Sequence, residues 1–310
     1  GVVAISMTTP LLVAQDSTAR FSAKGDPKLK TSWGEPDLQG LWSDEYQIPL
    51  QRLPKYAGRE LLTDQEVAAL DRERAAKPSF GEKRAEKGSE RDVAGAYNSD
   101  IFLTRRHTGK RTSLIVDPAD GHLPPLTPEA QRRAAARRVA AVDGPEALPL
   151  NTRCIWWQNA GPPLLPSPYN NNLQFIQTRD YVVIASENIH DARIIPMDGR
   201  PHGTLPQWAG DSRGRWDGTT LVVDTTNFSA KTSLRGSDEH LHLVERFSLV
   251  DANTLDYQFT ADDPTVWTQP WSAALRLHRT NEVMYEFACH EGNFLTMEGM
   301  LKTARLFAKP

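Results

Sequence analysis

The stretch LHLVERFSLVDANTLDYQFTA, residues 241–261, decides the fold class of this chain. Apolar residues recur at every second position in both halves, which is the pattern of strands with one buried face. Between the halves, Asp251, Ala252 and Asn253 are typical of a tight turn. The stretch therefore predicts two antiparallel strands joined by a short loop.

The same two-residue period continues through the C-terminal part of the chain, which begins with the proline-rich segment GPPLLPSPYNNN. The connections are too short for helical crossovers, so we expect an antiparallel sheet. About eight such strands close into a small barrel, and we predict an up-and-down, lipocalin-like barrel over residues 161–310, with a β-sandwich as the alternative. The expected strands cover residues 173–178, 181–186, 192–197, 220–226, 241–250, 254–261, 272–279 and 283–289.

Residues 16–160 form a more irregular N-terminal region with two segments that favour helices. In residues 62–77, Thr63 and Glu66 have the spacing of a capping box. The second helix follows Thr127 and Pro128, a residue pair that commonly starts helices. We expect both helices to pack on the barrel.

The composition narrows the functional classes. The 310 residues include 36 Lys and Arg against 39 Asp and Glu, a net charge of -3, so the sequence indicates no nucleic-acid partner and no polybasic membrane contact. It contains neither a G-x-G-x-x-G fingerprint nor a P-loop, so we expect no nucleotide cofactor. A small-molecule ligand is the expected partner, and the oligomeric state is left open.

Two features predict export to the periplasm or the medium. Residues 1–15 carry no charge and are mostly apolar, which resembles the end of a signal peptide; a buried strand is the alternative. Pro10 and the short length of the run argue against a membrane span. Cys154 and Cys289 suit one disulfide in an exported protein, with two free thiols as the alternative.

The segment GDSRG, residues 210–214, matches the nucleophile elbow of serine hydrolases. That motif requires a helix after the serine, whereas a turn and a strand are predicted here. We therefore expect Ser212 to be a polar turn residue.

The segment EHLHLVE offers a metal site as a second hypothesis. His240 and His242 are two residues apart, so on a strand both would face the same way, while Glu245 would face the opposite way. A metal needs further ligands, for which His190, His202 and His290 are available. The metal candidates are therefore His190, His242 and His290.

Two further stretches concentrate ionisable groups. In ACHEGN, a disulfide at Cys289 would hold His290 and Glu291 rigidly at the barrel mouth; a surface turn is the alternative.

In SENIHDARIIPMDGRPH, residues 186–202, Glu187 and His190 lie near the turn of an expected hairpin. Strand alternation puts His190 on one face and Asp191 with Arg193 on the other, so these groups cannot form one site by themselves. Arg193 is expected either in a solvated ion pair or in a buried anion clamp.

Loop aromatics and amides suggest a binding surface. Tyr169, Asn171, Trp208 and Trp216 lie in or beside predicted loops, where flat apolar faces and amides suit a sugar or an aromatic ligand. They equally suit plugs that close the barrel ends.

Seven motifs occur in an order that resembles a family of uncharacterised exported bacterial proteins, over about residues 33–300. The resemblance implies export and no assigned activity. The family pattern commonly has Asn where this chain has His240, which weakens the hypothesis of a two-histidine metal site. The motifs are GEPDLQGLW, RTSLIVDPADGHLPPLTPEAQ, GPPLLPSPYNNNLQFIQT, IHDARIIPMDGRPH, GDSRGRWDGTTLVVDTTNF, HLVERFSLVDANTLDYQFTADDP and YEFACHEGN.

Taken together, the sequence favours an exported enzyme that uses side-chain acid and base groups. A hydrolase, lyase or isomerase would act on a small aromatic- or carbohydrate-derived ligand held in the barrel. A histidine would be the base, a carboxylate would orient it, and an arginine would stabilise a developing anion. A non-catalytic lipocalin-like carrier and a His-ligated metalloenzyme are the alternatives. The catalytic candidates are His190, His242, His290, Glu187, Asp191, Glu291, Arg193 and Arg213.

Overall fold

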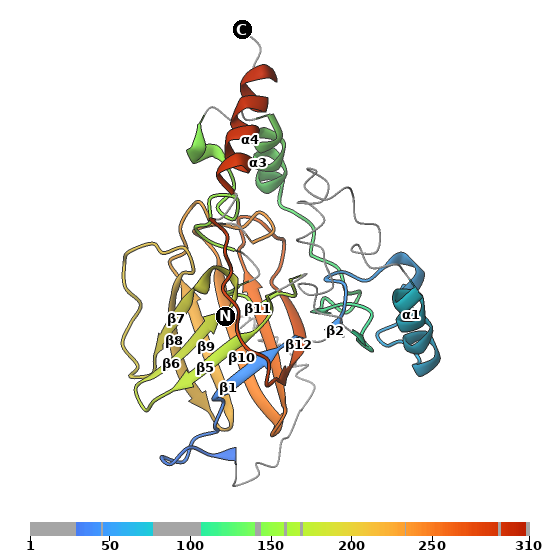
Figure 1. Ribbon diagram of the computed structural model, residues 1–310, viewed down its shortest axis with the longest axis vertical. Helices are drawn as coiled ribbons and strands as arrows, with labels where there is room; N and C mark the ends of the chain where they lie inside the picture. The colour runs from blue at the N-terminus through green and yellow to red at the C-terminus, as the bar shows by residue number, and fades with distance from the viewer. Residues whose placement is uncertain are drawn as a thin grey trace, which may run out of the picture.

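The alternating segments form a nearly closed antiparallel β-barrel in the computed structural model (Figure 1). The structure describes residues 29–44, 46–76, 107–139, 144–157, 160–167, 170–232, 234–290 and 293–307. The nine strands that follow one another around the barrel are β1 (Gly40–Ser43), β5 (Leu173–Gln177), β6 (Tyr181–Ser186), β7 (Ala192–Pro196), β8 (Asp211–Asp217), β9 (Thr220–Thr226), β10 (His242–Asp251), β11 (Thr254–Asp262) and β12 (Trp271–Arg279).

The remaining elements surround this ring. Strand β4 pairs with the start of β12, on the edge opposite β11, and β2 pairs with β3 in a separate parallel pair. These elements are β2 (Tyr46–Gln47), β3 (His107–Thr108), β4 (Ile115–Asp117), α1 (Asp64–Ala76), α3 (Pro128–Val139), α4 (Asn293–Phe307) and the short 3-10 helices η2 (Pro54–Tyr56), η3 (Pro145–Ala147) and η4 (Asn188–His190). None of the helices within the described ranges is long and apolar enough to cross a bilayer.

The up-and-down barrel predicted from the sequence is confirmed, with three differences in its strands, one of which is the inclusion of β1 in the ring. Residues 283–289 are not a strand, because amides of this segment bond to side chains rather than to a neighbouring strand. Residues 211–217 form β8, which the sequence analysis missed because its polar residues lack the usual β-branched pattern. Ser212 is therefore a strand residue and not part of a turn; it is 3% exposed.

The ring has one gap, between β7 and β8, which are the two ends of the hydrogen-bonded strand order. Every hydrogen-bonded pair around it is antiparallel. Because the ring has nine strands, an odd number, the two strands at the gap, β7 and β8, must run in the same direction. Side chains fill this gap, which we call the seam: a Cβ placed on Gly214 of β8 would lie 2.3 Å from Met197 Sδ and 2.9 Å from Ile195 Cγ2.

The interior of the barrel is packed with side chains. Phe247 and Tyr257, whose ring centroids are 4.8 Å apart, belong to a row of aromatic contacts that runs through Phe175, Phe259 and Trp271. All five side chains are almost completely buried, and each contributes about 1.5–3 kcal/mol relative to exposure. The barrel is therefore held mainly by apolar burial.

Segments from the N-terminal region complete the barrel. Strand β1 lies between β12 and β5, so the ring includes residues from both sides of the expected boundary at residue 160. The capping box of α1 is present: the Glu66 amide donates to Thr63 Oγ1, and the Thr63 amide donates to Glu66 Oε2. Thr127 Oγ1 accepts the Ala130 amide at the start of α3, as expected.

Candidate functional site

The candidate catalytic groups gather at one end of the barrel, which we call the upper end. Strands β5, β7, β8, β10 and β12 begin at this end, and β6, β9 and β11 finish there, because neighbouring strands alternate in direction. The ionisable groups at this end form three sets: a network inside the barrel, a cluster on its outer face, and a groove at its rim.

The network inside the barrel is centred on Glu245. Arg193 Nη1 donates to Glu245 Oε2 at 2.7 Å, and these side chains are 9% and 0% exposed. The Tyr257 hydroxyl donates to Glu245 Oε1 at 2.8 Å and accepts the Leu164 amide at 2.9 Å. Burial, reinforced by the charge of Glu245, raises the pKa of Tyr257 well above its ordinary value. The network joins β7, β10, β11 and the proline-rich segment.

Arg193 therefore takes part in a buried ion pair, and its partner is Glu245 rather than the neighbouring Asp191. The expected alternation holds on β7, where Ile195 is completely buried and Ile194 is 61% exposed. The second guanidinium nitrogen of Arg193, Nη2, is buried and has no hydrogen-bond partner in the described part of the chain.

The cluster on the outer face joins two histidines through one carboxylate. His242 Nε2 lies 2.8 Å from Asp224 Oδ2, and His202 Nε2 lies 2.9 Å from Asp224 Oδ1. An ionised carboxylate only accepts hydrogen bonds, so each imidazole donates a proton-bearing Nε2 to Asp224. This arrangement leaves the Nδ1 lone pair of each neutral ring unused by Asp224. We call these three residues the His–Asp–His cluster.

A second carboxylate supports this cluster. Asp211 Oδ2 accepts the Gly203 amide at 2.6 Å and lies 3.7 Å from His202 Nδ1. Arg213 Nη1 donates to Asp211 Oδ1, and Arg213 Nε donates to the Pro201 carbonyl at 3.0 Å. The segment that carries His202 is thus fixed to the start of β8. This fixes the position of the imidazole relative to Asp224.

The third set lines a groove at the rim. The groove, about 620 Å³ in volume, lies between the end of β6, η4 and an extended segment, residues 280–289, which we call the strap. Glu187 Oε1 accepts the Tyr285 amide at 2.7 Å, and His190 Nε2 accepts the Phe287 amide at 3.0 Å. Side-chain acceptors on η4 and its preceding residue therefore attach the strap to the barrel. The lining residues are Ala185, Ser186, Glu187, His190, Met284, Tyr285 and Glu286.

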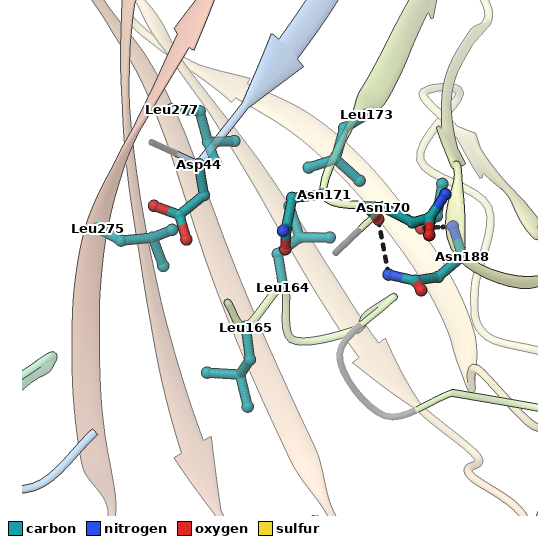
Figure 2. A pocket seen from close by; sticks show the side chains of 10 residues that line it. Asp44, Leu164, Leu165, Asn170, Asn171, Leu173, Asn188, Leu275 and Leu277 are labelled. Carbon is teal, nitrogen blue, oxygen red and sulfur yellow. Dashed lines mark hydrogen bonds between the residues drawn. The ribbon is translucent and has the colours of Figure 1, made fainter. Parts of the chain in front are cut away.

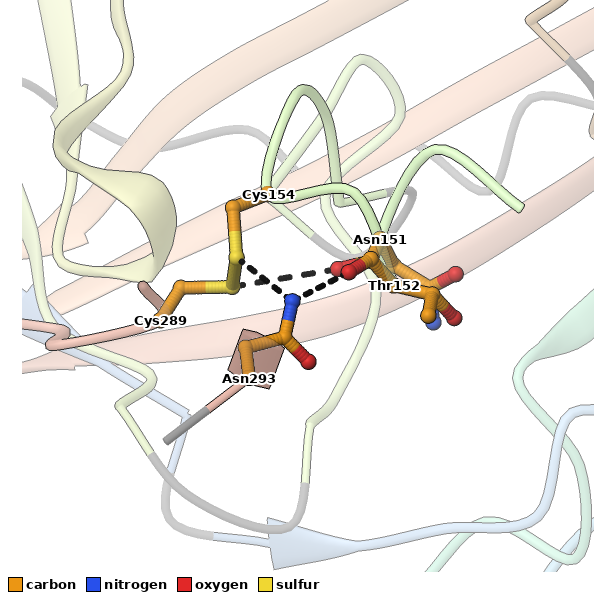
Figure 3. Close-up of a disulfide and its surroundings, with 5 residues drawn as sticks. All are labelled: Asn151, Thr152, Cys154, Cys289 and Asn293. Atoms are coloured by element: carbon orange, nitrogen blue, oxygen red, sulfur yellow. Dashed lines mark hydrogen bonds between the residues drawn. A yellow bond between two sulfur atoms is a disulfide. The ribbon is translucent and has the colours of Figure 1, made fainter. Parts of the chain in front are cut away.

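The predicted disulfide is present and anchors the end of the strap (Figure 3). Cys154 and Cys289 are joined, with their Cα atoms 5.8 Å apart. Asn293 Nδ2, at the start of α4, donates to the Thr152 carbonyl and lies 3.3 Å from Cys154 Sγ. The strap is thus covalently tied to the loop before the proline-rich segment.

A smaller cavity lies inside the rim (Figure 2). Its volume is about 20 Å³, which is room for about one water molecule. Asn171, a predicted ligand-binding residue, lines this cavity, but its amide bonds to the backbone of Ser167 at 2.7 and 2.8 Å. These two bonds shape the loop. Asn188 Oδ1, also on the lining, is buried without a hydrogen-bond partner in the described ranges.

The other predicted site residues are dispersed. His290 is exposed beside the disulfide, and no contact brings it to His190 or His242 within the described residues. Trp208 is 39% exposed, whereas Trp216 packs against the core from β8. Tyr169, Glu291 and residues 1–15 lie outside the described residues.

Two expectations about individual side chains are wrong: the shared strand face of His240 and His242, and the turn position of Ser212. His240 and His242 do not share a strand face, because His240 lies in the turn before β10. Ser212 Oγ pairs with Thr225 Oγ1 at 3.0 Å inside the barrel and contacts no histidine, in agreement with its rejection as a nucleophile.

The sequence alone does not predict Asp224, Asp211 or Tyr257 as partners in these sets. Alternation along LVVDTT does place Asp224 on the outer face, opposite the buried Leu221 and Val223. The pairing of β9 with β10, which brings Asp224 opposite Val244 and close to His242, cannot be read from one strand alone.

Comparisons with family models and with curated proteins find no match. Among the described residues, no three His, Cys, Asp or Glu side chains are arranged to hold a metal ion.

Proposed function

We propose that the protein is an exported enzyme that uses side-chain acid and base groups at the upper end of the barrel. The chemistry is that of a hydrolase, lyase or isomerase acting on a small aromatic- or carbohydrate-derived substrate. The observation that carries this proposal is the pair of short contacts from His202 and His242 to Asp224. A histidine held through one ring nitrogen by a carboxylate is a common arrangement of a general base.

His242 has the geometry of the base. Its Nε2–H donates to Asp224, so the free lone pair is on Nδ1 and can take a proton from a substrate. The imidazole is about half exposed, so a substrate can reach it. Asp224 would stabilise the imidazolium that forms, as the carboxylate does in a catalytic triad.

His202 and Arg213 support the base in different ways. His202 occupies the other oxygen of Asp224 and fixes the carboxylate plane; a proton bound at its Nδ1 would face Asp211. Arg213 uses Nη1 and Nε to fix Asp211 and Pro201. Nη2 of Arg213 makes no hydrogen bond to the described residues, so it is the group available to a developing anion.

His190 does not suit the role of base that the sequence suggested. Its Nε2 accepts the Phe287 amide, so a neutral ring carries its proton on Nδ1 and has no lone pair free for a substrate. The Nε2 lone pair accepts the hydrogen bond that attaches the strap, and only the Nδ1–H of the ring remains, as a donor.

Two further observations support the rest of the proposal. A disulfide forms and persists in oxidising compartments, which supports export. The barrel interior is filled by aromatic side chains, so we place the substrate at the upper end instead of deep inside the barrel.

The test compares variants on a panel of aryl esters, aryl ethers and oxidised sugars. Removal of a positioned general base lowers rates by about 10²–10⁴-fold, so His242→Ala and Asp224→Asn should lose most turnover. His240→Ala, an exposed histidine two residues away, is the matched control and should keep full activity. Turnover that persists in both His242→Ala and Asp224→Asn would refute the assignment.

A further inference from the structure

We infer that the groove between η4 and the strap is a binding site for a neutral saccharide. Its volume of about 620 Å³ falls within the range of small-ligand sites, about 300–1,000 Å³. It lies apart in sequence from the His–Asp–His cluster, on different strands. The inference concerns binding alone and does not depend on turnover by that cluster.

The groove offers hydrogen-bonding groups that match hydroxyl groups. His190 presents an Nδ1–H donor, because its Nε2 is held by the Phe287 amide. Glu286 presents a carboxylate that makes no hydrogen bond or ion pair with the described residues. A hydroxyl group both donates and accepts, so a polyol can satisfy the imidazole and the carboxylate together.

An aromatic side chain completes the set. Tyr285 lines the groove and is 70% exposed, beside the thioether of Met284. Exposed aromatic rings provide a flat apolar surface with a polar tip, which suits the C–H face of a sugar ring.

The charge of the lining disfavours anionic ligands. Glu187 and Glu286 lie on opposite walls, and the lining contains no Lys or Arg. The negative charges of these two carboxylates repel an anionic ligand and so contribute to specificity. Glu187 accepts the Tyr285 and Asn172 amides, which partly satisfies that carboxylate and leaves Glu286 as the carboxylate available to a ligand hydroxyl group.

The walls of the groove are held in place before a ligand arrives. The strap is attached by Glu187, by His190 and by the Cys154–Cys289 disulfide. On the other wall, Ile189 and His190 have φ values of 58° and 56°, which cost of order 1–3 kcal/mol each in residues other than glycine. Such strain concentrates at ligand sites, and a preformed site loses less entropy on binding.

The test measures binding to the full chain by calorimetry and saturation-transfer NMR. The probes are cellobiose, maltose and lactose as neutral saccharides, glucuronate as an anion and phenethylamine as a cation. We expect at least one neutral disaccharide to bind with a Kd below about 10 mM, and glucuronate to bind more weakly. Tyr285→Ala and Glu286→Gln should each weaken that binding by about tenfold, a loss of roughly 1.4 kcal/mol.

Controls on the strap separate the groove from the rest of the surface. Glu282→Gln and Val283→Ala change exposed strap residues that do not line the groove, and they should leave affinity unchanged. The inference fails if none of the three disaccharides binds at 10 mM, if phenethylamine binds more tightly than they do, or if Tyr285→Ala leaves saccharide binding intact. Because no turnover is measured, none of these outcomes affects the proposed acid–base function.

Discussion

Arg193 and Glu245, 52 residues apart in the chain, form an ion pair of 2.7 Å across the inside of the barrel. Removal of one partner of a buried pair leaves an uncompensated charge, which costs about 3–5 kcal/mol. We therefore expect Glu245→Leu to lower the free energy of unfolding by roughly that amount, measured by urea denaturation.

The double variant Arg193→Met with Glu245→Leu tests the same pair differently. Replacing both charges by apolar side chains of similar volume is often neutral or stabilising, so the double variant should be more stable than Glu245→Leu alone. Glu239→Leu, at an exposed turn position, is the control. If the single and double variants lose the same free energy of unfolding, the pair contributes through the packing of its side chains and not through its charges.

The second prediction concerns alkaline pH. Burial raises the folded-state pKa of Tyr257 above the ordinary value for tyrosine of about 10, so the stabilisation is fully present below pH 10 and declines as pH rises above it. The wild type should therefore lose up to about 1.4 kcal/mol per pH unit more than Tyr257→Phe above pH 10. Urea unfolding between pH 8 and pH 11 measures the difference. Tyr285→Phe, which is exposed, should follow the wild type.

The third prediction concerns the disulfide. Cys154 and Cys289 are 135 residues apart, and closing so long a loop stabilises the folded chain by about 4–5 kcal/mol in the chain-entropy model. Cys154→Ser with Cys289→Ser should show that loss in urea, and proteolysis should then begin in the strap. Reduced wild-type protein should behave as the double variant does. If both keep the stability of the oxidised wild type, the bridge contributes little to folding.

The fourth prediction concerns the seam between β7 and β8. A methyl group on Gly214 would lie within 3 Å of Met197 and Ile195, so Gly214→Ala should cost about 1–3 kcal/mol through overpacking. Met197→Ala in the same chain should recover part of the loss, since it removes the closest side chain. Gly144→Ala, where a Cβ meets nothing within 4 Å, should be nearly neutral. Thermal unfolding distinguishes these variants.

Much of the fold follows from local patterns. The two-residue alternation that buries Phe247 and Tyr257 also defines seven of the nine barrel strands, and the Thr63–Glu66 spacing defines the start of α1. Strand β8 escaped detection because DSRGRWD is held in the sheet by backbone pairing with β9 and not by apolar residues. Residues 283–289 have the alternation of a strand, but their amides are satisfied by Glu187 and His190.

The candidate site was less predictable, because it depends on which strands become neighbours. Alternation correctly separated Arg193 from Ile194 on β7, but His190 lies in η4 and not on the return strand, so the strand pattern does not apply to it. The partners Glu245 and Asp224 come from strands 52 and 18 residues away from Arg193 and His242, and their contacts follow from barrel closure and register. The residue pattern along one strand contains no information about barrel closure or about register.

The position of β1 has a consequence for the order of folding. Trp42 of β1 pairs with Arg279 of β12, so the ring joins residues separated by 279 − 42 = 237 positions. The hairpins β8–β9 and β10–β11 have tight turns and form early, whereas a contact over so long a separation is slow to form. During synthesis, therefore, the strand made first is the last to find its place, and the barrel stays open until residue 279 has left the ribosome.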